Sequence, residues 1–255
     1  MKSKAFSLVE LSIVLVILGL LTGGILTGQS LIRAAELRAV TTEFQNYQTA
    51  VMTFRDKYFA LPGDMSDAEA FWDTMATGTC PDATAGTGAQ TCNGNGDGEL
   101  TGASADSRAG ERFTFWQHLA NAGLIEGTYT GIAGAASGDD AVIGENTPAS
   151  KVSQGGWAVS YWDSASGNGV WFDYDYDNHL TFGSQVPGFT ASGDLLVPEE
   201  AWGIDKKIDD GKLGRGKVIS RWVGCTDAAN SAALDADYNL ALSASECAFR
   251  MKAGF

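Results

Sequence analysis

An apolar segment near the N-terminus most constrains what this chain can fold into. Between Lys4 and Arg33 the only ionisable side chain is that of Glu10. A helix that crosses a bilayer needs about 20 mostly apolar residues, and Lys2 and Lys4 favour a cytoplasmic location for the N-terminal side. The segment is therefore predicted to anchor the chain in a membrane.

A secretory signal peptide is one alternative, because it also begins basic and then becomes apolar. The apolar run here is longer than the roughly 7–15 residues of a signal core, and Thr22-Gly23-Gly24 is only a weak cleavage site. An ordinary single-pass anchor is the other alternative. Neither explains Glu10, since a carboxylate in hydrocarbon costs about 2.5–3.5 kcal/mol and by default marks a functional site with a partner.

A cut between Ala5 and Phe6 would supply that partner. The new amino group of Phe6 would lie one helical turn from Glu10, or would reach the Glu10 of a neighbouring chain. An ion pair would then offset the cost of placing the carboxylate in an apolar environment.

Residues 4–11, with the sequence KAFSLVEL, resemble the processing and methylation site of type IV pilins and of the pseudopilins of type II secretion. The resemblance implies that a prepilin peptidase cuts before Phe6 and methylates its amine. It also implies that Glu10 meets the N-terminal amine of an adjacent subunit and sets the register of a filament. Ala5 departs from the usual glycine before the cut, so slower processing is expected. The resemblance covers residues 1–60.

A helical pattern continues beyond the anchor and ends at Pro62-Gly63. Its apolar side chains recur at steps of three and four on one face, which later residues must cover: Leu37, Val40, Phe44, Tyr47, Val51, Phe54 and Tyr58. We therefore expect a leader over 1–5, a transmembrane and filament-core helix over 6–32, an amphipathic stalk over 33–60 and a globular head over 61–255.

The expected fold class is α+β, with the long helix packed on a head that contains a small antiparallel sheet and short helices. Ser66 and Glu69 have the form of a capping box, and a Gly- and Ser-rich connector between two aromatic runs predicts a hairpin. Short helices are predicted at 66–75, 108–121 and 198–209, and strands at 156–162, 170–176 and 218–223.

All four cysteines follow the anchor, which fits an oxidising periplasmic or extracellular location. Four cysteines allow three pairings. We favour the two local pairs, Cys80–Cys92 and Cys225–Cys247, each stabilising by about 3 kcal/mol; free buried thiols are the alternative. A closed loop at 225–247 also resembles the disulfide-bounded C-terminal loop of type IV pilins.

Oxygen-bearing side chains alternate with glycines in the segment NGNGDGE, and this pattern is typical of Ca²⁺-binding loops. Asn93, Asn95, Asp97 and Glu99 are the candidate ligands. A Ca²⁺ loop of the usual length ends in glutamate, whereas the corresponding position here is Ser104. The favoured alternative is a turn held by asparagine side-chain hydrogen bonds.

Other polar residues are weaker candidates for metal ligation. His118 has no second ligand at suitable spacing, so a half-buried packing or hydrogen-bonding role is expected. On a strand at 170–176 the aspartates would share one face, where solvation is favoured over cation binding. Asp205, Asp209 and Asp210 form a further group, and the pseudopilins that this chain resembles often carry Ca²⁺ near such a place. The two groups are Asp173, Asp175 and Asp177, and Asp205, Asp209 and Asp210.

Composition and motifs favour a structural protein. The net charge of −14 argues against nucleic-acid binding, and the chain contains no nucleophile elbow, phosphate loop or paired-histidine motif, so no enzyme activity is expected. We expect a subunit of a type IV pilus or type II secretion pseudopilus, anchored in the bacterial inner membrane and then assembled with other pilins or pseudopilins in the periplasm or at the cell surface. The alternatives are a minor or tip subunit whose enlarged head binds a surface or a secreted substrate, and a membrane-anchored binding protein that does not assemble.

Overall fold

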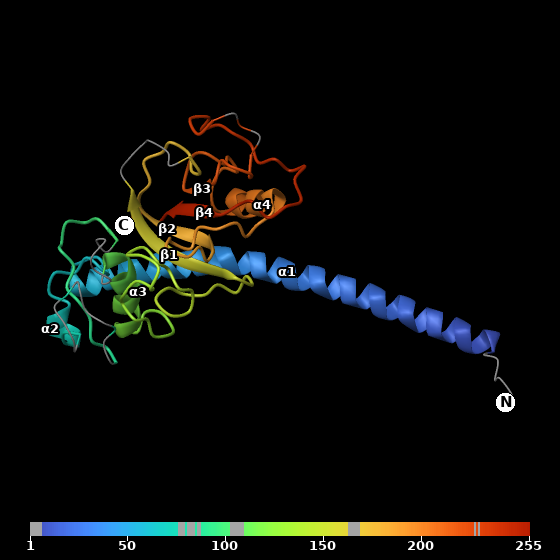
Figure 1. The fold of residues 1–255 in the computed structure, drawn as a ribbon, viewed down its shortest axis with the longest axis horizontal. Coiled ribbons are helices and arrows are strands. Elements are labelled where there is room, and N and C mark those ends of the chain that lie inside the picture. Colours follow the sequence, from blue (N-terminus) through green and yellow to red (C-terminus); the bar gives the residue numbers. More distant parts are fainter. Residues whose placement is uncertain are drawn as a thin grey trace.

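The computed structural model describes residues 7–75, 80, 85, 88–102, 110–162, 169–226, 228 and 230–255. They form one long helix, α1 (Leu8–Tyr58), and a head that packs around the second half of this helix (Figure 1). The first half of α1 projects away from the head as a free rod. The expected α+β fold class is confirmed.

Local chemistry sets both ends of α1. At the start, the Ser7 hydroxyl accepts a hydrogen bond from the Val9 N–H at 3.3 Å, and Glu10 Oε2 accepts one from the Ser7 N–H at 2.9 Å, which is a capping box. At the end, Phe59 adopts a left-handed conformation and donates its N–H to the Arg55 carbonyl at 2.8 Å. The helix stops just before Pro62, as the sequence predicts.

The second half of α1 buries the predicted apolar stripe. Val40, Phe44, Val51 and Phe54 are each at most 2% exposed. The half-buried Tyr47 extends the stripe through edge-on ring contacts with two tryptophans of the head. The head therefore folds around this part of the helix as its central core element.

Four antiparallel strands form the sheet, in the order β1-β2-β4-β3. One face of the sheet meets the core through a series of ring contacts that begins at Phe44 on α1 and continues through Trp157, Phe182 and Phe249. The strands are β1 (Gly155–Trp162), β2 (Asp177–Ser184), β3 (Val218–Ser220) and β4 (Phe249–Lys252).

Three short helices surround this core: α2 (Glu69–Trp72), α3 (Glu111–Asn121) and α4 (Pro198–Ile208). α2 lies at the end of the head that is furthest from the free rod (Figure 1). Both α3 and α4 contact α1, and they lie at opposite edges of the sheet, α3 against β1 and α4 against β3. The predicted helices at 108–121 and 198–209 agree with α3 and α4 to within a few residues.

The structure corrects the expected head in three places. The strand expected at 170–176 is instead a loop, and the partner of β1 is the next segment, β2. Trp171, Phe172 and Tyr176 are buried in this loop, so their apolar character reflects core packing without a strand. β4 was not predicted, because its four residues are too few for an alternating pattern to be distinctive.

The third correction concerns the helix expected at 66–75, which is shorter than predicted. α2 has no side-chain cap, and its first N–H, that of Glu69, donates instead to Asn93 Oδ1 at 2.8 Å. The Glu69 carboxylate accepts a hydrogen bond from the Thr74 hydroxyl at 2.6 Å instead of completing a capping box with Ser66. Contacts to other segments therefore replace the local cap.

Polar contacts of Arg33 and Glu43 help to hold the head to α1. Arg33 makes a bidentate ion pair with Glu200 of α4, at 2.6 and 2.7 Å, where α1 leaves the head. Glu43 accepts hydrogen bonds from the Ser150 hydroxyl at 2.7 Å, the Lys151 N–H at 2.9 Å and the buried indole N–H of Trp157 at 2.8 Å. Glu43 thus links the stalk to β1 and to the loop that precedes it.

Replacing Glu43 by alanine should lower the free energy of unfolding by about 2–4 kcal/mol, because a buried indole N–H and a backbone N–H lose a charged acceptor. Chemical denaturation of the full chain in detergent measures this effect. Asp56→Ala is the matched control, since Asp56 is an exposed acid on the same helix, and its change should stay within about 0.5 kcal/mol. Equal stability of the Glu43→Ala variant and the wild type would contradict the assigned role.

Candidate functional site

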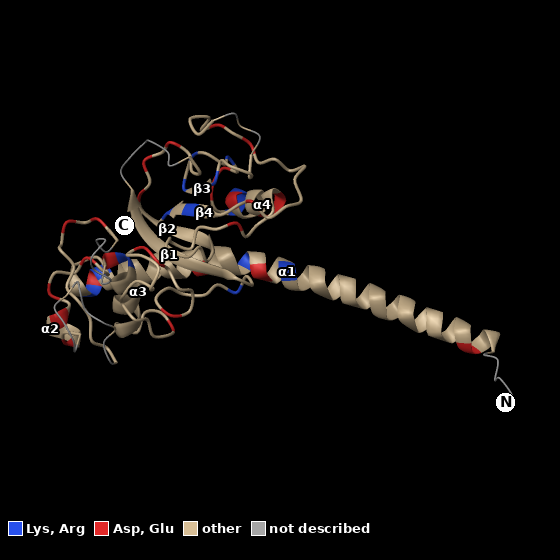
Figure 2. Cartoon of the chain, viewed as in Figure 1, with Lys and Arg blue, Asp and Glu red and all other residues tan. Residues whose placement is uncertain are grey.

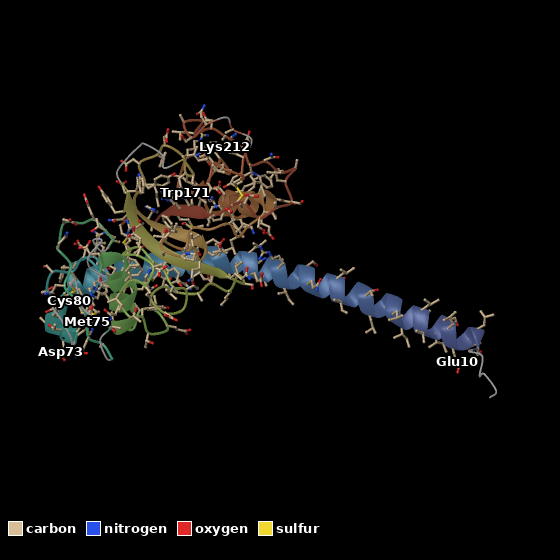
Figure 3. The ribbon with its side chains drawn as sticks, viewed as in Figure 1. Glu10, Asp73, Met75, Cys80, Trp171 and Lys212 are labelled. Carbon is tan, nitrogen blue, oxygen red and sulfur yellow. A yellow bond between two sulfur atoms is a disulfide. The ribbon has the colours of Figure 1, made fainter. Side chains whose placement is uncertain are left out.

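The free half of α1 is an uncovered apolar surface. Its large apolar side chains, from Leu8 to Ile32, are 50–85% exposed, and they project on all sides of the helix (Figure 3). By length and composition, α1 is the one helix among the described residues that is able to cross a membrane. Because exposed apolar surface is costly in water, this half needs a bilayer or other helices around it.

Glu10 is the one acidic residue on this half, and Figure 3 shows it at the free end of α1, far from the head. Its Oε2 atom caps the helix through the Ser7 N–H at 2.9 Å. Among the described residues, no hydrogen bond reaches its other oxygen. Within the part of the chain that the structure describes, Glu10 thus serves its own helix through one carboxylate oxygen. The predicted processing residues, Ala5 and Phe6, lie outside the described residues.

The sequence of this segment matches one known family. Residues 1–26 match the family model described as the prokaryotic N-terminal methylation motif. The chain is thus prepilin-like and carries a cleavage and methylation motif that is typical of the type IV pilin and pseudopilin family. No curated protein and no solved structure matches the chain.

The motif and the helix have joint consequences for location and partners. By family inference, the motif implies processing by a prepilin peptidase and assembly with pilins. The apolar helix together with the motif is consistent with anchoring in the inner membrane before assembly. The matched residues end within the anchor, so they carry no information on the head.

The structure contains both of the favoured local disulfides. Cys80 is bonded to Cys92 with a Cα–Cα separation of 5.5 Å, and Cys225 to Cys247 with a separation of 5.1 Å. The first lies near Met75 at the α2 end of the head (Figure 3). The second is fully buried, and it fixes the chain two residues before β4 begins. It therefore positions a central strand of the sheet.

The candidate Ca²⁺ ligands of the glycine-rich segment form a hydrogen-bonded turn. Asn95 accepts the Asp97 N–H at 2.9 Å and donates its side-chain amide to the Asp97 carboxylate at 2.7 Å. Asp97 in turn accepts the Glu99 N–H at 2.9 Å, while the Asn93 side chain binds the start of α2. Of the four candidates, only Asp97 belongs to a described cluster of acids.

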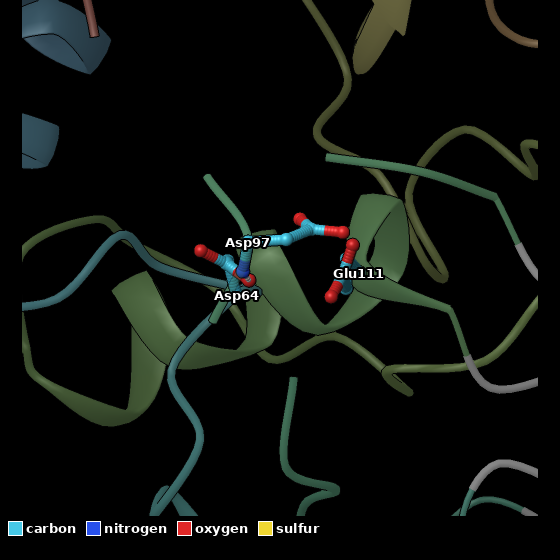
Figure 4. A group of neighbouring side chains, drawn as sticks. All are labelled: Asp64, Asp97 and Glu111. Carbon is cyan, nitrogen blue, oxygen red and sulfur yellow. Dashed lines mark hydrogen bonds between the residues drawn. The ribbon is translucent and has the colours of Figure 1, made fainter. Parts of the chain in front are cut away.

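That cluster consists of Asp64, Asp97 and Glu111, whose carboxylate oxygens lie within 4.8 Å of one another (Figure 4). Asp64 accepts three backbone N–H groups, from Gly96 at 2.6 Å, Asp97 at 3.1 Å and Gly98 at 2.9 Å. Burial raises the pKa of Asp64 and of Glu111, and the backbone hydrogen bonds oppose this rise. The oxygens are of the type that a hard cation prefers, but their described role is to satisfy the amides of the loop.

Sequence reasoning missed Asp64 and Glu111 as neighbours of Asp97. Asp64 follows the end of α1, whereas Glu111 is the first residue of α3. Glu111 accepts the Asn95 N–H at 3.0 Å and the Thr101 N–H at 3.1 Å, so the two acids hold the same loop from opposite sides. Such a meeting depends on tertiary structure, and no local spacing could reveal it.

The second predicted acidic group, Asp205, Asp209 and Asp210, is brought together by the structure. Asp205 is fully buried and accepts the Tyr238 hydroxyl at 2.9 Å, and burial raises the pKa of its carboxyl to about 7. Asp209 accepts the Lys217 N–H, and Asp210 pairs with an arginine at 3.1 Å. These acids hold the turn between α4 and β3.

Asp173, Asp175 and Asp177 do not share a strand face, because residues 173–176 lie in the loop before β2. Asp177 is the first residue of β2 and pairs with Lys252 of β4 at 3.1 Å. The prediction that Asp173, Asp175 and Asp177 lie together on one strand is therefore wrong.

His118 on α3 is more deeply buried than expected. Its ring is fully buried; Nδ1 accepts the Gly63 N–H at 2.9 Å, and Nε2 lies 2.9 Å from the Thr91 hydroxyl. Burial lowers the pKa of the ring to about 3. The neutral imidazole therefore connects the turn after α1 to the segment that contains the first disulfide.

This burial makes His118 a source of acid sensitivity. The unfolded chain binds a proton at this ring near pH 6.5, whereas the folded chain excludes it until about pH 3. Stability is therefore lost as the pH falls below 6.5, by about 1.4 kcal/mol per pH unit from this group.

His118→Gln removes this titration and leaves the other titrating groups in place. The stability advantage of the wild type over the variant should shrink by about 2 kcal/mol between pH 7 and pH 5. Denaturation of both proteins at the two pH values measures the difference. A difference that does not change with pH would contradict the buried neutral ring.

Proposed function

We propose that this protein is a structural subunit of a type IV pilus or type II secretion pseudopilus. The observation that carries the proposal is the division of α1: its second half is covered by the head, whereas its first half is apolar, uncovered and lies largely within the methylation motif of residues 1–26. The uncovered half suits a bilayer first and a bundle of identical helices afterwards. Transfer between two apolar environments avoids exposure to water.

In this proposal the chain has four functional parts. Residues 1–5 are a leader that is removed between Ala5 and Phe6, and Phe6 is then methylated. Residues 6–32 are the transmembrane segment and later the filament core, 33–60 are the stalk, and 61–255 are the head. Other pilin or pseudopilin subunits are the partners, and the head faces the periplasm or the cell exterior.

Glu10 sets the axial register in this assembly by pairing with the N-terminal amine of an adjacent subunit. The geometry of Glu10 supports this role, because among the described residues its carboxylate makes one hydrogen bond, through Oε2 to the Ser7 N–H. An ion pair between subunits is strong in an apolar bundle and also offsets the cost of burying the carboxylate.

Two substitutions of Glu10 separate register from helix capping. Glu10→Ala removes both functions, whereas Glu10→Gln keeps the side-chain acceptor of a capping box and removes the charge. Both variants should insert in the membrane at wild-type levels, and both should lose incorporation into filaments by at least about tenfold, which corresponds to about 1.4 kcal/mol. Shearing and immunoblotting of filament and membrane fractions from the native cell measure this. Normal incorporation of the Glu10→Gln variant would exclude the ion pair.

A further inference from the structure

The loop of residues 93–98 repeats a chemically labile sequence, because Asn93, Asn95 and Asp97 are each followed directly by glycine. In an Asn-Gly pair the glycine nitrogen loses its proton and attacks the side-chain carbonyl carbon of the asparagine. The bond from that carbon to the side-chain nitrogen breaks, the nitrogen leaves with the proton as ammonia, and a cyclic succinimide remains. Water then opens the ring to aspartate or isoaspartate. An Asp-Gly pair forms the same ring with loss of water.

The fold requires glycine at two of these positions. Gly96 has φ 78° and Gly98 has φ 89°, which is the left-handed region where a Cβ atom is strained. Glycine also favours the succinimide reaction, because it has no side chain to obstruct its nitrogen. Residues 95–98 are exposed, so water reaches them. Another residue after Asn95 or Asp97 would strain the turn, so stability of the labile pairs has to come from another part of the structure.

The buried Asp64 carboxylate binds both attacking nitrogens. The Gly96 N–H donates to Asp64 Oδ1 at 2.6 Å, and the Gly98 N–H donates to Asp64 Oδ2 at 2.9 Å. Figure 2 shows acidic residues in many loops of the head. Asp64, in contrast, is 5% exposed, and it lies next to Asp97 (Figure 4). One carboxylate thus holds the nucleophiles of two labile pairs.

The charge of Asp64 opposes the reaction at its first step. A glycine nitrogen becomes negative when it loses its proton, and a carboxylate at hydrogen-bond distance repels that charge. Water screens this repulsion only weakly, because the carboxylate is buried. In the unreacted loop the same carboxylate stabilises the protonated nitrogen through a charge-assisted hydrogen bond. Both effects raise the barrier to attack.

Hydrogen bonds also restrain the side chains that would be attacked. Asn95 Oδ1 accepts the Asp97 N–H at 2.9 Å, and the Asn95 side-chain amide donates to Asp97 Oδ2 at 2.7 Å. Asp97 Oδ1 accepts the Glu99 N–H at 2.9 Å. These contacts restrict the rotation that brings each side-chain carbon onto the following nitrogen, and the reaction depends on that alignment.

We propose that Asn95 and Asp97 are sites of succinimide modification that Asp64 keeps unreacted by binding the amide nitrogens of Gly96 and Gly98. The proposal is independent of the filament function, because it concerns the chemistry of the folded head alone. The first labile pair provides a comparison within the same loop. Its nitrogen, that of Gly94, donates to the Met65 carbonyl at 2.8 Å and is not held by the Asp64 carboxylate.

Asp64→Asn in the full chain, purified in detergent and incubated at mildly alkaline pH, tests the proposal. Peptide mapping by mass spectrometry measures conversion at Asn95, and chromatography of the isoaspartyl peptide measures it at Asp97. In the folded wild type, conversion at Asn95 should be at least about tenfold slower than in the unfolded, reduced chain. The variant should lose most of this protection, because its side chain is neutral and turns an NH₂ group towards one of the two glycine N–H groups. Asn93 should change much less.

Glu43→Ala is the matched control, since it is expected to destabilise the head without contact to this loop; its Asn95 should react at the wild-type rate. Equal acceleration at Asn93, or in this control, would attribute the effect to unfolding and overturn the proposal. An unchanged rate at Asn95 in Asp64→Asn would also overturn it. A slower rate would do so too, because Asp64 would then act as a base that promotes attack.

Hydrogen exchange in the wild type gives a test that does not depend on folding of the variant. The amides of Gly96 and Gly98 should exchange slowly although both residues are exposed, because the Asp64 carboxylate holds them. Exchange as fast as in the unfolded chain would overturn the proposal, and so would equal rates of Asn95 conversion in the folded and unfolded wild type.

Discussion

The packing of the head against the second half of α1 is the contact on which the rest of the structure depends. The sheet, α3 and α4 all pack around the stripe that includes Val40, Phe44 and Phe54, and contacts between aromatic rings connect this stripe to the central strands. Without the helix the sheet would have an uncovered apolar face, and without the head the stripe would be exposed. The two parts of the chain therefore stabilise each other.

The polar contacts add direction to this apolar packing. Glu43 fixes β1 and its preceding loop along the helix, and Arg33 pairs with α4 where the helix leaves the head. Directional contacts define one orientation of the head, whereas apolar burial alone tolerates several. A filament needs such a fixed orientation, since every copy must present the same surfaces to its neighbours.

Local sequence patterns were sufficient for the long helix, its apolar stripe, α4 and both disulfides, because each depends on residues that are close in the chain. The head was harder. β2 was misplaced because the aromatic residues Trp171 and Phe172 have the composition of a strand but pack from a loop. The acids around Asp97 could not be predicted as a group, because Asp64 and Glu111 reach it only through the packing of α1 against α3.

The central claim is that the chain is processed at its N-terminus and then assembles through the uncovered half of α1. Intact mass and N-terminal fragmentation of the protein from sheared filaments of its native cell test this most directly. The account predicts a chain that begins with monomethylated Phe6 and has a mass lower by four hydrogens than the reduced form, which corresponds to two disulfides. A chain that begins at Met1, or one found only in membranes while the peptidase is active, would contradict it.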